Sequence, residues 1–160
     1  MRGTLFALAL LLGSLTAYAG GGDDFASRYM KLYAKGTSLT CTTVSPTMMS
    51  RIMNVAAADN EPHVREVLAR LKSLRIVDLK EPDEGDSLYV KAVDLLRQNR
   101  NRYQAYGKAD STAHRSFWFR RKGETVVEII MIDRPGGEGM NIVDLTGNMD
   151  DTFIKELLRL

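Results

Sequence analysis

The second half of the chain contains strand-like runs in close succession, and this feature most constrains the fold. Short turns such as Lys122-Gly123 separate the runs. Consecutive strands joined by short turns pair antiparallel, because a parallel connection needs a dozen or more residues. An antiparallel meander is therefore predicted at residues 103–108, 115–121, 124–133 and 140–145.

The first half alternates strand-like runs with helical patterns. Residues 37–44 and 74–79 resemble strands, because they alternate or are rich in β-branched and apolar residues. Helix starts are indicated by capping residues or proline ahead of apolar residues at helical spacing. These starts follow Asp23-Asp24, Ser45, Asn60 and Ser87, and a last helix covers residues 153–160. The pattern predicts one α+β domain over residues 20–160, with helices on one face of a largely antiparallel sheet.

Residues 1–19 have the order of a secretory signal peptide. A positive start is followed by the apolar run Leu5–Leu12 and by the small-residue site Ala17-Tyr18-Ala19. The apolar run is too short to span a bilayer. We therefore expect cleavage near Ala19, a periplasmic or secreted chain, and no stable membrane insertion after cleavage.

Charge and cysteine content narrow the possible partners. The 22 basic and 20 acidic residues nearly balance, which provides no strong field for nucleic acid, so we expect no nucleic-acid partner. Cys41 is the single cysteine, so the chain has no internal disulfide. A buried, inert thiol is the expectation for Cys41, with an intermolecular disulfide or a soft-metal ligand as the alternative.

Four segments of the chain carry a family resemblance: "FASRYMKLYAKG", "LTCTTVSPTMMSRIM", "VLARLKSLRIVDL" and the ending "VVEIIMID … MNIVDLTGNMD". Together they resemble the DUF4252 family of small exported bacterial proteins of uncharacterised function. The resemblance runs from about Phe25 to Leu160. It implies the fold and the compartment, and it brings no catalytic or binding residues.

Catalytic and metal motifs are missing from the sequence. His63 and His114 have no nucleophile nearby in sequence, so surface or capping roles are expected. The glycine-rich segment 134–141 joins two strands and indicates a hairpin loop. A non-enzymatic protein without a cofactor is therefore predicted, and a hydrolase-type enzyme with an unrecognised site is the alternative.

A methionine-rich face offers a second alternative. Met48, Met49 and Met53 lie at helical spacing, and Cys41 precedes them. Soft sulfur ligands select Cu(I), but methionine also commonly fills gaps in cores. Core packing is expected here, and a carrier of a metal or of a small apolar ligand remains the alternative.

The strand at 114–123 carries bulky aromatic side chains on both faces. Alternation places Phe117 and Phe119 on one face and Trp118 on the other. One face must pack on helices, and the other is available for a partner unless Trp118 lies under a loop or the first helix. The covered position of Trp118 is the preferred interpretation, and the candidate binding residues of an exposed face are Trp118, Arg120, Tyr106 and Glu128.

The segment "GNMDD" at 147–151 lies between a strand and the last helix. A calcium loop requires alternating oxygen ligands, and Phe153 interrupts that alternation. Helix capping is the better interpretation, with Gly147-Asn148 as a turn of positive φ. The predicted structural caps are Asp150, Asp151 and Ser45.

These observations together predict an exported binding protein. Its partner is expected to be a protein or another envelope component, with a role in envelope regulation as one possibility. The oligomeric state is left open by the sequence.

Overall fold

The protein, described here from a computed structural model, is built on a six-stranded antiparallel sheet. The structure describes residues 24–45, 47–48, 51, 69–107, 115–134 and 139–157. The spatial order of the strands is β1-β2-β6-β5-β4-β3. The strands are β1 (Leu39–Val44), β2 (Leu71–Leu79), β3 (Gln104–Ala105), β4 (Arg115–Lys122), β5 (Thr125–Asp133) and β6 (Asn141–Met149). The helices are α2 (Phe25–Tyr33), the 3-10 turn η1 (Pro82–Glu84), α5 (Gly85–Gln98) and α6 (Asp151–Leu157).

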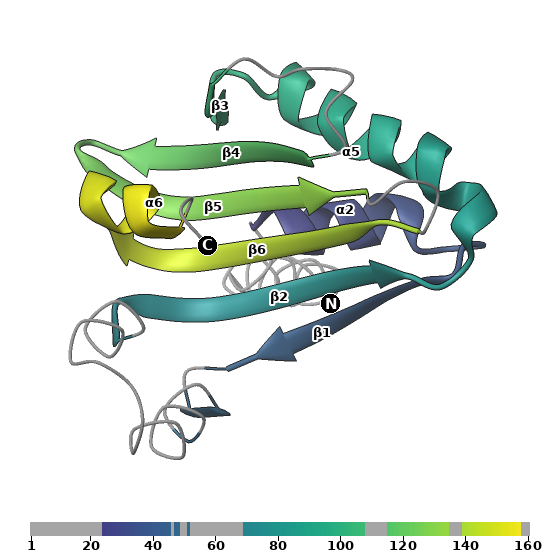
Figure 1. Cartoon of the computed structure of the whole chain (residues 1–160), viewed down its shortest axis with the longest axis horizontal. Helices are drawn as coiled ribbons and strands as arrows, with labels where there is room; N and C mark the ends of the chain where they lie inside the picture. Colours follow the sequence, from purple (N-terminus) through teal and green to yellow (C-terminus); the bar gives the residue numbers. More distant parts are fainter. Residues whose placement is uncertain are drawn as a thin grey trace, which may run out of the picture.

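This architecture confirms the predicted α+β class. Strands β4, β5 and β6 form consecutive antiparallel pairs, and the short β3 pairs with β4. The first hairpin, β1-β2, joins the sheet on the other side, where β2 pairs with β6. The last strand of the chain, β6, therefore lies between β2 and β5 (Figure 1).

Helices α2 and α5 cover one face of the sheet, which we call the helix-covered face. Apolar side chains from alternate strand positions meet Tyr29 of α2 and Leu88 and Leu96 of α5 in one buried cluster. The Tyr29 hydroxyl donates a hydrogen bond to the Leu88 carbonyl oxygen over 2.8 Å, which ties the two helices together. The strand residues at the centre of this core are Val77, Ile130, Ile132 and Ile142.

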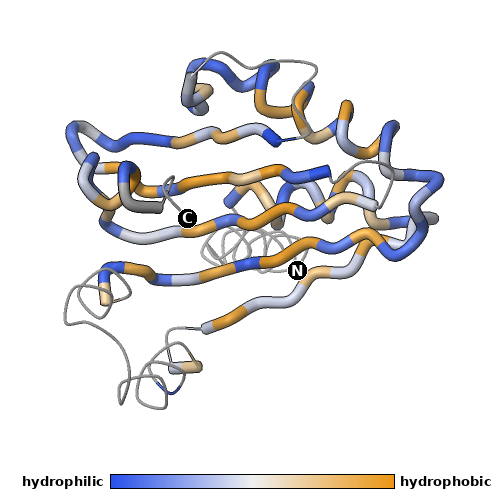
Figure 2. Tube along the Cα trace, viewed as in Figure 1, coloured by the Kyte–Doolittle hydropathy of each residue, from blue (hydrophilic) through white to orange (hydrophobic). Residues whose placement is uncertain are grey.

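The opposite side of the sheet, which we call the second face, packs against α6. Phe153 and Ile154 of α6 are buried in a separate apolar cluster with Ile129 and Leu145. The expectation of helices on one face therefore holds for α2 and α5, while α6 lies across one end of the second face (Figure 1). Figure 2 shows apolar residues running along β2, β5 and β6, as expected for central strands buried from both sides.

Helix caps form at several of the predicted positions. The Asp150 carboxylate accepts a 2.8 Å hydrogen bond from the Phe153 amide at the start of α6, and the Ser45 hydroxyl accepts one from the Met48 amide over 3.3 Å. Asp151 has a different role from the one expected: it is the first residue of α6, and its carboxylate pairs with Arg121.

Gly147 corrects the predicted turn. It lies inside β6 and has no positive φ, so the strand continues to Met149 instead of ending at a turn. A Cβ atom at this position would lie 2.3 Å from the carbonyl oxygen of Arg70. Glycine is required because the backbone entering β2 approaches β6 closely at this point, next to an irregularity in the β2-β6 register.

Some expectations concern residues outside the described ranges. These are the signal peptide at 1–19, the helix start at Asn60, residues 135–138 of the glycine-rich loop, the histidines His63 and His114, and the methionines Met49 and Met53. Within the described part of the chain, no helix is long and apolar enough to cross a membrane.

The close approach at Gly147 predicts a specific loss of stability. Gly147→Ala forces its methyl group against the Arg70 carbonyl, and overpacking of this kind costs about 1–3 kcal/mol or more. Urea denaturation at neutral pH measures the change in the free energy of unfolding. Asn148→Ala, at the exposed neighbouring position, is the control and should change it by less than about 0.5 kcal/mol. Equal effects of the two substitutions would contradict the packing argument.

Candidate functional site

The first turn of α2 is docked on the sheet by carboxylates. The Phe25 amide donates to Glu128 Oε1 over 2.6 Å, and the Ala26 amide donates to Asp144 Oδ2 over 2.8 Å. The Ser27 amide donates to Asp24 Oδ1 over 2.8 Å. The first amides of a helix lack partners within the helix and lie at its positive end. Three consecutive amides of α2 are thus satisfied by three carboxylates, two of which come from strands more than 100 residues away in sequence.

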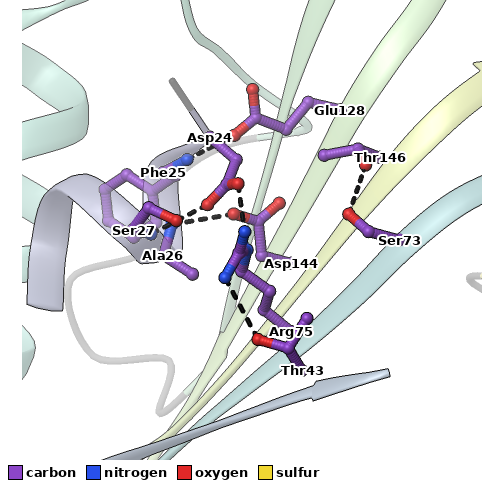
Figure 3. A network of polar contacts seen from close by, with 10 residues as sticks. All are labelled: Asp24, Phe25, Ala26, Ser27, Thr43, Ser73, Arg75, Glu128, Asp144 and Thr146. Atoms are coloured by element: carbon purple, nitrogen blue, oxygen red, sulfur yellow. Dashed lines mark hydrogen bonds and ion pairs between the residues drawn. The ribbon is translucent and has the colours of Figure 1, made fainter. Parts of the chain in front are cut away.

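Arginines from the sheet compensate these carboxylates. Arg75 Nε lies 2.9 Å from Asp24 Oδ2, and its Nη1 donates to Thr43 Oγ1 over 3.1 Å. Arg120 Nε lies 2.5 Å from Glu128 Oε2. We call these residues the cap cluster: Asp24, Glu128, Asp144, Arg75 and Arg120. Figure 3 shows the first four of them.

Burial dominates the electrostatics of the cap cluster. Glu128 and Asp144 are fully buried. Loss of hydration raises the pKa of the Asp144 carboxyl well above its usual range, and the neighbouring charge of Glu128 raises it further. Burial also raises the pKa of Glu128, although the Phe25 amide and Arg120 oppose the shift. The pKa of the nearby Tyr103 hydroxyl rises to about 12, first because it is buried and then because Glu128 is close.

The cap cluster has the geometry of a structural joint. Every one of its carboxylates accepts a hydrogen bond from a helix amide, and α2 lies directly over them (Figure 3). Two buried oxygen atoms, Asp144 Oδ1 and the Tyr103 hydroxyl, have no hydrogen-bond partner among the described residues. The described residues contain no group of three or more histidine, cysteine, aspartate or glutamate side chains that could hold a metal ion.

The structure corrects the predicted patch around Trp118. Trp118 is only 5% exposed, lies in the core of the helix-covered face, and donates from Nε1 to Ser116 Oγ over 3.3 Å. Arg120 and Glu128 point to the same covered face and belong to the cap cluster. The patch is not exposed, because α2 and α5 cover this face, and the preferred interpretation of Trp118 as packed beneath other elements is confirmed. Tyr106 is different, since it is 46% exposed.

Cys41 also differs from its expectation. The thiol was expected to be buried, but Cys41 is exposed on β1, which is the edge strand of the sheet. Met48, expected in a core, is 48% exposed.

Tyr106 helps to form a pocket between β4 and α6, which we call the α6 pocket. Its volume is about 270 Å³. Arg121 is held in place there: its guanidinium lies 5.1 Å from the centre of the Phe119 ring and pairs with Asp151 over 2.5 Å. The lining residues are Tyr106, Phe119, Arg121, Asp151, Ile154 and Lys155.

A band of apolar side chains lies beside the α6 pocket on the second face, and we call it the apolar strip. The strand registers align its members across four neighbouring strands, and each of them is only partly buried. The row of side chains next to the strip on the side of α6 is apolar. The row next to the strip on the opposite side is polar. The strip consists of Ile76, Val143, Met131 and Phe117.

Sequence reasoning missed the cap cluster, although a signal was present. Glu128 and Asp144 each lie two residues from an apolar core residue, Ile130 and Ile142 respectively, and so face the same core. A charged side chain that points from a central strand into the core needs a buried partner. The identity of that partner, the N-terminus of α2, depends on how distant elements pack.

The raised pKa values predict a pH dependence. The unfolded chain loses the Asp144 proton near pH 4, whereas the folded chain holds it to higher pH. Stability is therefore lost as pH rises above about 4 toward the folded pKa. Asp144→Asn keeps an acceptor for the Ala26 amide and does not ionise.

We expect the stability of Asp144→Asn relative to wild type to increase as pH rises from 3 to 7. Urea denaturation across this range measures the difference. Asp94→Asn, an exposed change on α5, is the matched control and should show much less dependence on pH. A difference for Asp144→Asn that stays constant or shrinks with rising pH would contradict the assignment.

Comparison with known proteins supports the family resemblance. The family model described as "Domain of unknown function (DUF4252)" matches residues 33–157. This span starts at the last residue of α2 and includes every strand of the sheet. Comparisons with curated proteins and with solved structures return no match. Because the family model covers most of its length, the chain belongs to the DUF4252 family.

Proposed function

We propose that this protein is an exported binding protein that works in the periplasm or cell envelope without catalysing a reaction. The observation that carries the proposal is the apolar strip on the second face, beside the α6 pocket. The signal-peptide pattern of residues 1–19 supports the location. The use of the buried carboxylates as helix caps supports a structural role for the cap cluster and leaves the second face as the place for a partner.

The dimensions of the apolar strip fit a helical segment of a protein partner. Neighbouring strands are about 4.8 Å apart, so four strands span about 15 Å. An α-helix of about 10 residues has this length and can present an apolar face to the strip. The proposed partner is therefore an envelope protein with an amphipathic helix.

The surroundings of the strip resemble the rim of a protein interface. Polar pairs border it on one side: Arg115 with Asp133 at 2.9 Å, and Asn141 with Asp78 at 2.5 Å. Interfaces commonly combine an apolar centre with a polar, solvated rim. The ordered rim favours a partner that lies flat on the second face between this row and α6.

Site-specific cross-linking in cells tests this proposal. A photoreactive residue placed at Phe117 should capture a distinct envelope protein, because the side chain lies in the apolar strip. Val90 is 55% exposed on α5, away from the second face, and is the matched control position. The protein captured at Phe117 should also be captured at Met131 and not at Val90. Identical products at all three positions, or none at Phe117 and Met131 in folded protein, would overturn the proposal.

The α6 pocket supports a second candidate function, the binding of a small molecule. Its volume of about 270 Å³ lies near the lower end for ligand pockets. Phe119 and Ile154 provide apolar walls, and Lys155 provides a cation with no ion-pair partner among the described residues. The matching ligand has a small aromatic or aliphatic body and one anionic group.

Ligand carriage predicts a co-purifying compound. Native mass spectrometry of the exported protein should detect a bound small anion, and Lys155→Ala should reduce its occupancy several-fold, because the cation pairs with the anionic group. Lys72→Ala, at an exposed position on β2, should leave occupancy unchanged. Protein without any bound compound, or equal occupancy in both variants, would exclude this second function.

A further inference from the structure

The two edges of the sheet differ in how they are protected. At one edge β3 is only two residues long, and β4 carries Arg115, Arg121 and Lys122 and has an irregular register at Arg120/Arg121. Short strands, charges and bulges are the usual means by which proteins prevent an edge from pairing with another chain. The β3-β4 edge uses all three.

The other edge, formed by β1, uses none of these devices. β1 has six residues, "LTCTTV", with no charge, proline or glycine. It pairs with β2 over its whole length without a register shift. The four central residues, Thr40 to Thr43, are exposed, and no described strand pairs with the outer side of β1. Its outward amide and carbonyl groups therefore form a regular, uncharged template for another strand.

We propose that β1 pairs antiparallel with β1 of a second copy of this chain, so that the two sheets join around a two-fold axis. Self-pairing suits this strand, because an uncharged edge meets its own copy without like-charge repulsion. A two-fold axis perpendicular to the strands makes the two copies of β1 antiparallel and brings the same edge of each copy into contact. Threonine also favours extended structure and forms favourable cross-strand pairs.

The outward hydrogen-bonding groups of a strand belong to alternate residues, which limits the possible registers. Symmetric pairing must therefore place odd-numbered residues opposite odd-numbered residues and even-numbered residues opposite even-numbered ones. The two registers with the greatest overlap are centred on Cys41 and on Thr42. In the first, Cys41 faces Cys41 of the partner subunit, and Thr40 faces Thr42 of the partner subunit. In the second, Thr42 faces Thr42 of the partner subunit, and Cys41 faces Thr43 of the partner subunit.

The exposed thiol distinguishes these registers. Residues directly opposite each other in antiparallel strands have Cα atoms about 4.5–5.5 Å apart. Disulfides form at Cα separations of about 4.4–6.8 Å. The register centred on Cys41 therefore permits a cross-link between subunits, whereas the register centred on Thr42 places each thiol opposite a threonine.

The dimer should depend on protein concentration, because five paired residues of β1 bury less surface than a typical permanent interface. Sedimentation of the exported chain over a concentration series, with reductant present, measures the association. We expect a monomer–dimer equilibrium that Thr42→Lys weakens at least tenfold, since two like charges then meet near the axis. High salt should restore part of the association of this variant. Thr152→Lys makes the same change at an exposed position on α6 and should leave the equilibrium unchanged.

Thermal denaturation of both variants confirms that each is folded before association is compared. A chain that stays monomeric at every concentration overturns the proposal. A dimer that Thr42→Lys does not weaken also overturns it, because that dimer uses another surface. A foreign protein strand on a monomeric chain would be a different occupant of β1 and would likewise exclude self-pairing.

Cross-linking with oxidised glutathione then reads the register. Two Cys41 thiols react with one oxidised glutathione to give the intersubunit disulfide and two reduced glutathione molecules. A covalent dimer that is absent in Cys41→Ser and slower to form in Thr42→Lys supports pairing centred on Cys41. A reversible dimer that is sensitive to Thr42→Lys and does not cross-link supports pairing centred on Thr42.

Discussion

Docking of the α2 amides on Glu128 and Asp144 is the interaction on which the helix-covered face depends. Two buried carboxylates in adjacent central strands are costly unless they are hydrogen-bonded and compensated. The positive end of a helix supplies directed hydrogen-bond donors, and the partly exposed side chains of Arg75 and Arg120 supply positive charge. The same contacts determine where α2 begins on the sheet, so the charges specify the position of the helix as well as satisfying each other.

The position of α2 in turn makes one face of the sheet a buried core and leaves the second face partly uncovered. With α2 and α5 on one side, Trp118 and the cap cluster are enclosed, and the short α6 covers only part of the other side. The apolar strip and the α6 pocket lie on the second face, and the outer side of β1 lies at the edge of the sheet. The surfaces proposed for a partner protein, a small ligand and a second copy are thus distinct parts of one sheet, and the β1 edge touches the cap cluster through the hydrogen bond from Arg75 to Thr43.

The aromatic strand β4 shows what residue alternation can predict and what it cannot. Alternation correctly separated Phe117 and Phe119 from Trp118. It did not reveal which of the two sides would be covered, because both carry large apolar side chains. Tyr106 was the predicted binding residue that lies on an accessible surface, beside Phe119 in the α6 pocket. Gly147 shows a similar limit: its need for close backbone approach comes from Arg70, which is distant in sequence.

The sequence by itself determined the α+β class, the antiparallel pairing of β4, β5 and β6, the family, and the caps at Ser45 and Asp150. These features follow from short-range causes: residue alternation, turn length, and a side chain that reaches an amide three residues away. Tertiary structure alone decided the burial of Trp118, the partners of Glu128 and Asp144, and the exposure of Cys41. These depend on which face α2 covers and which strand lies at the edge. Both are set by contacts between residues far apart in the chain, which no local pattern encodes.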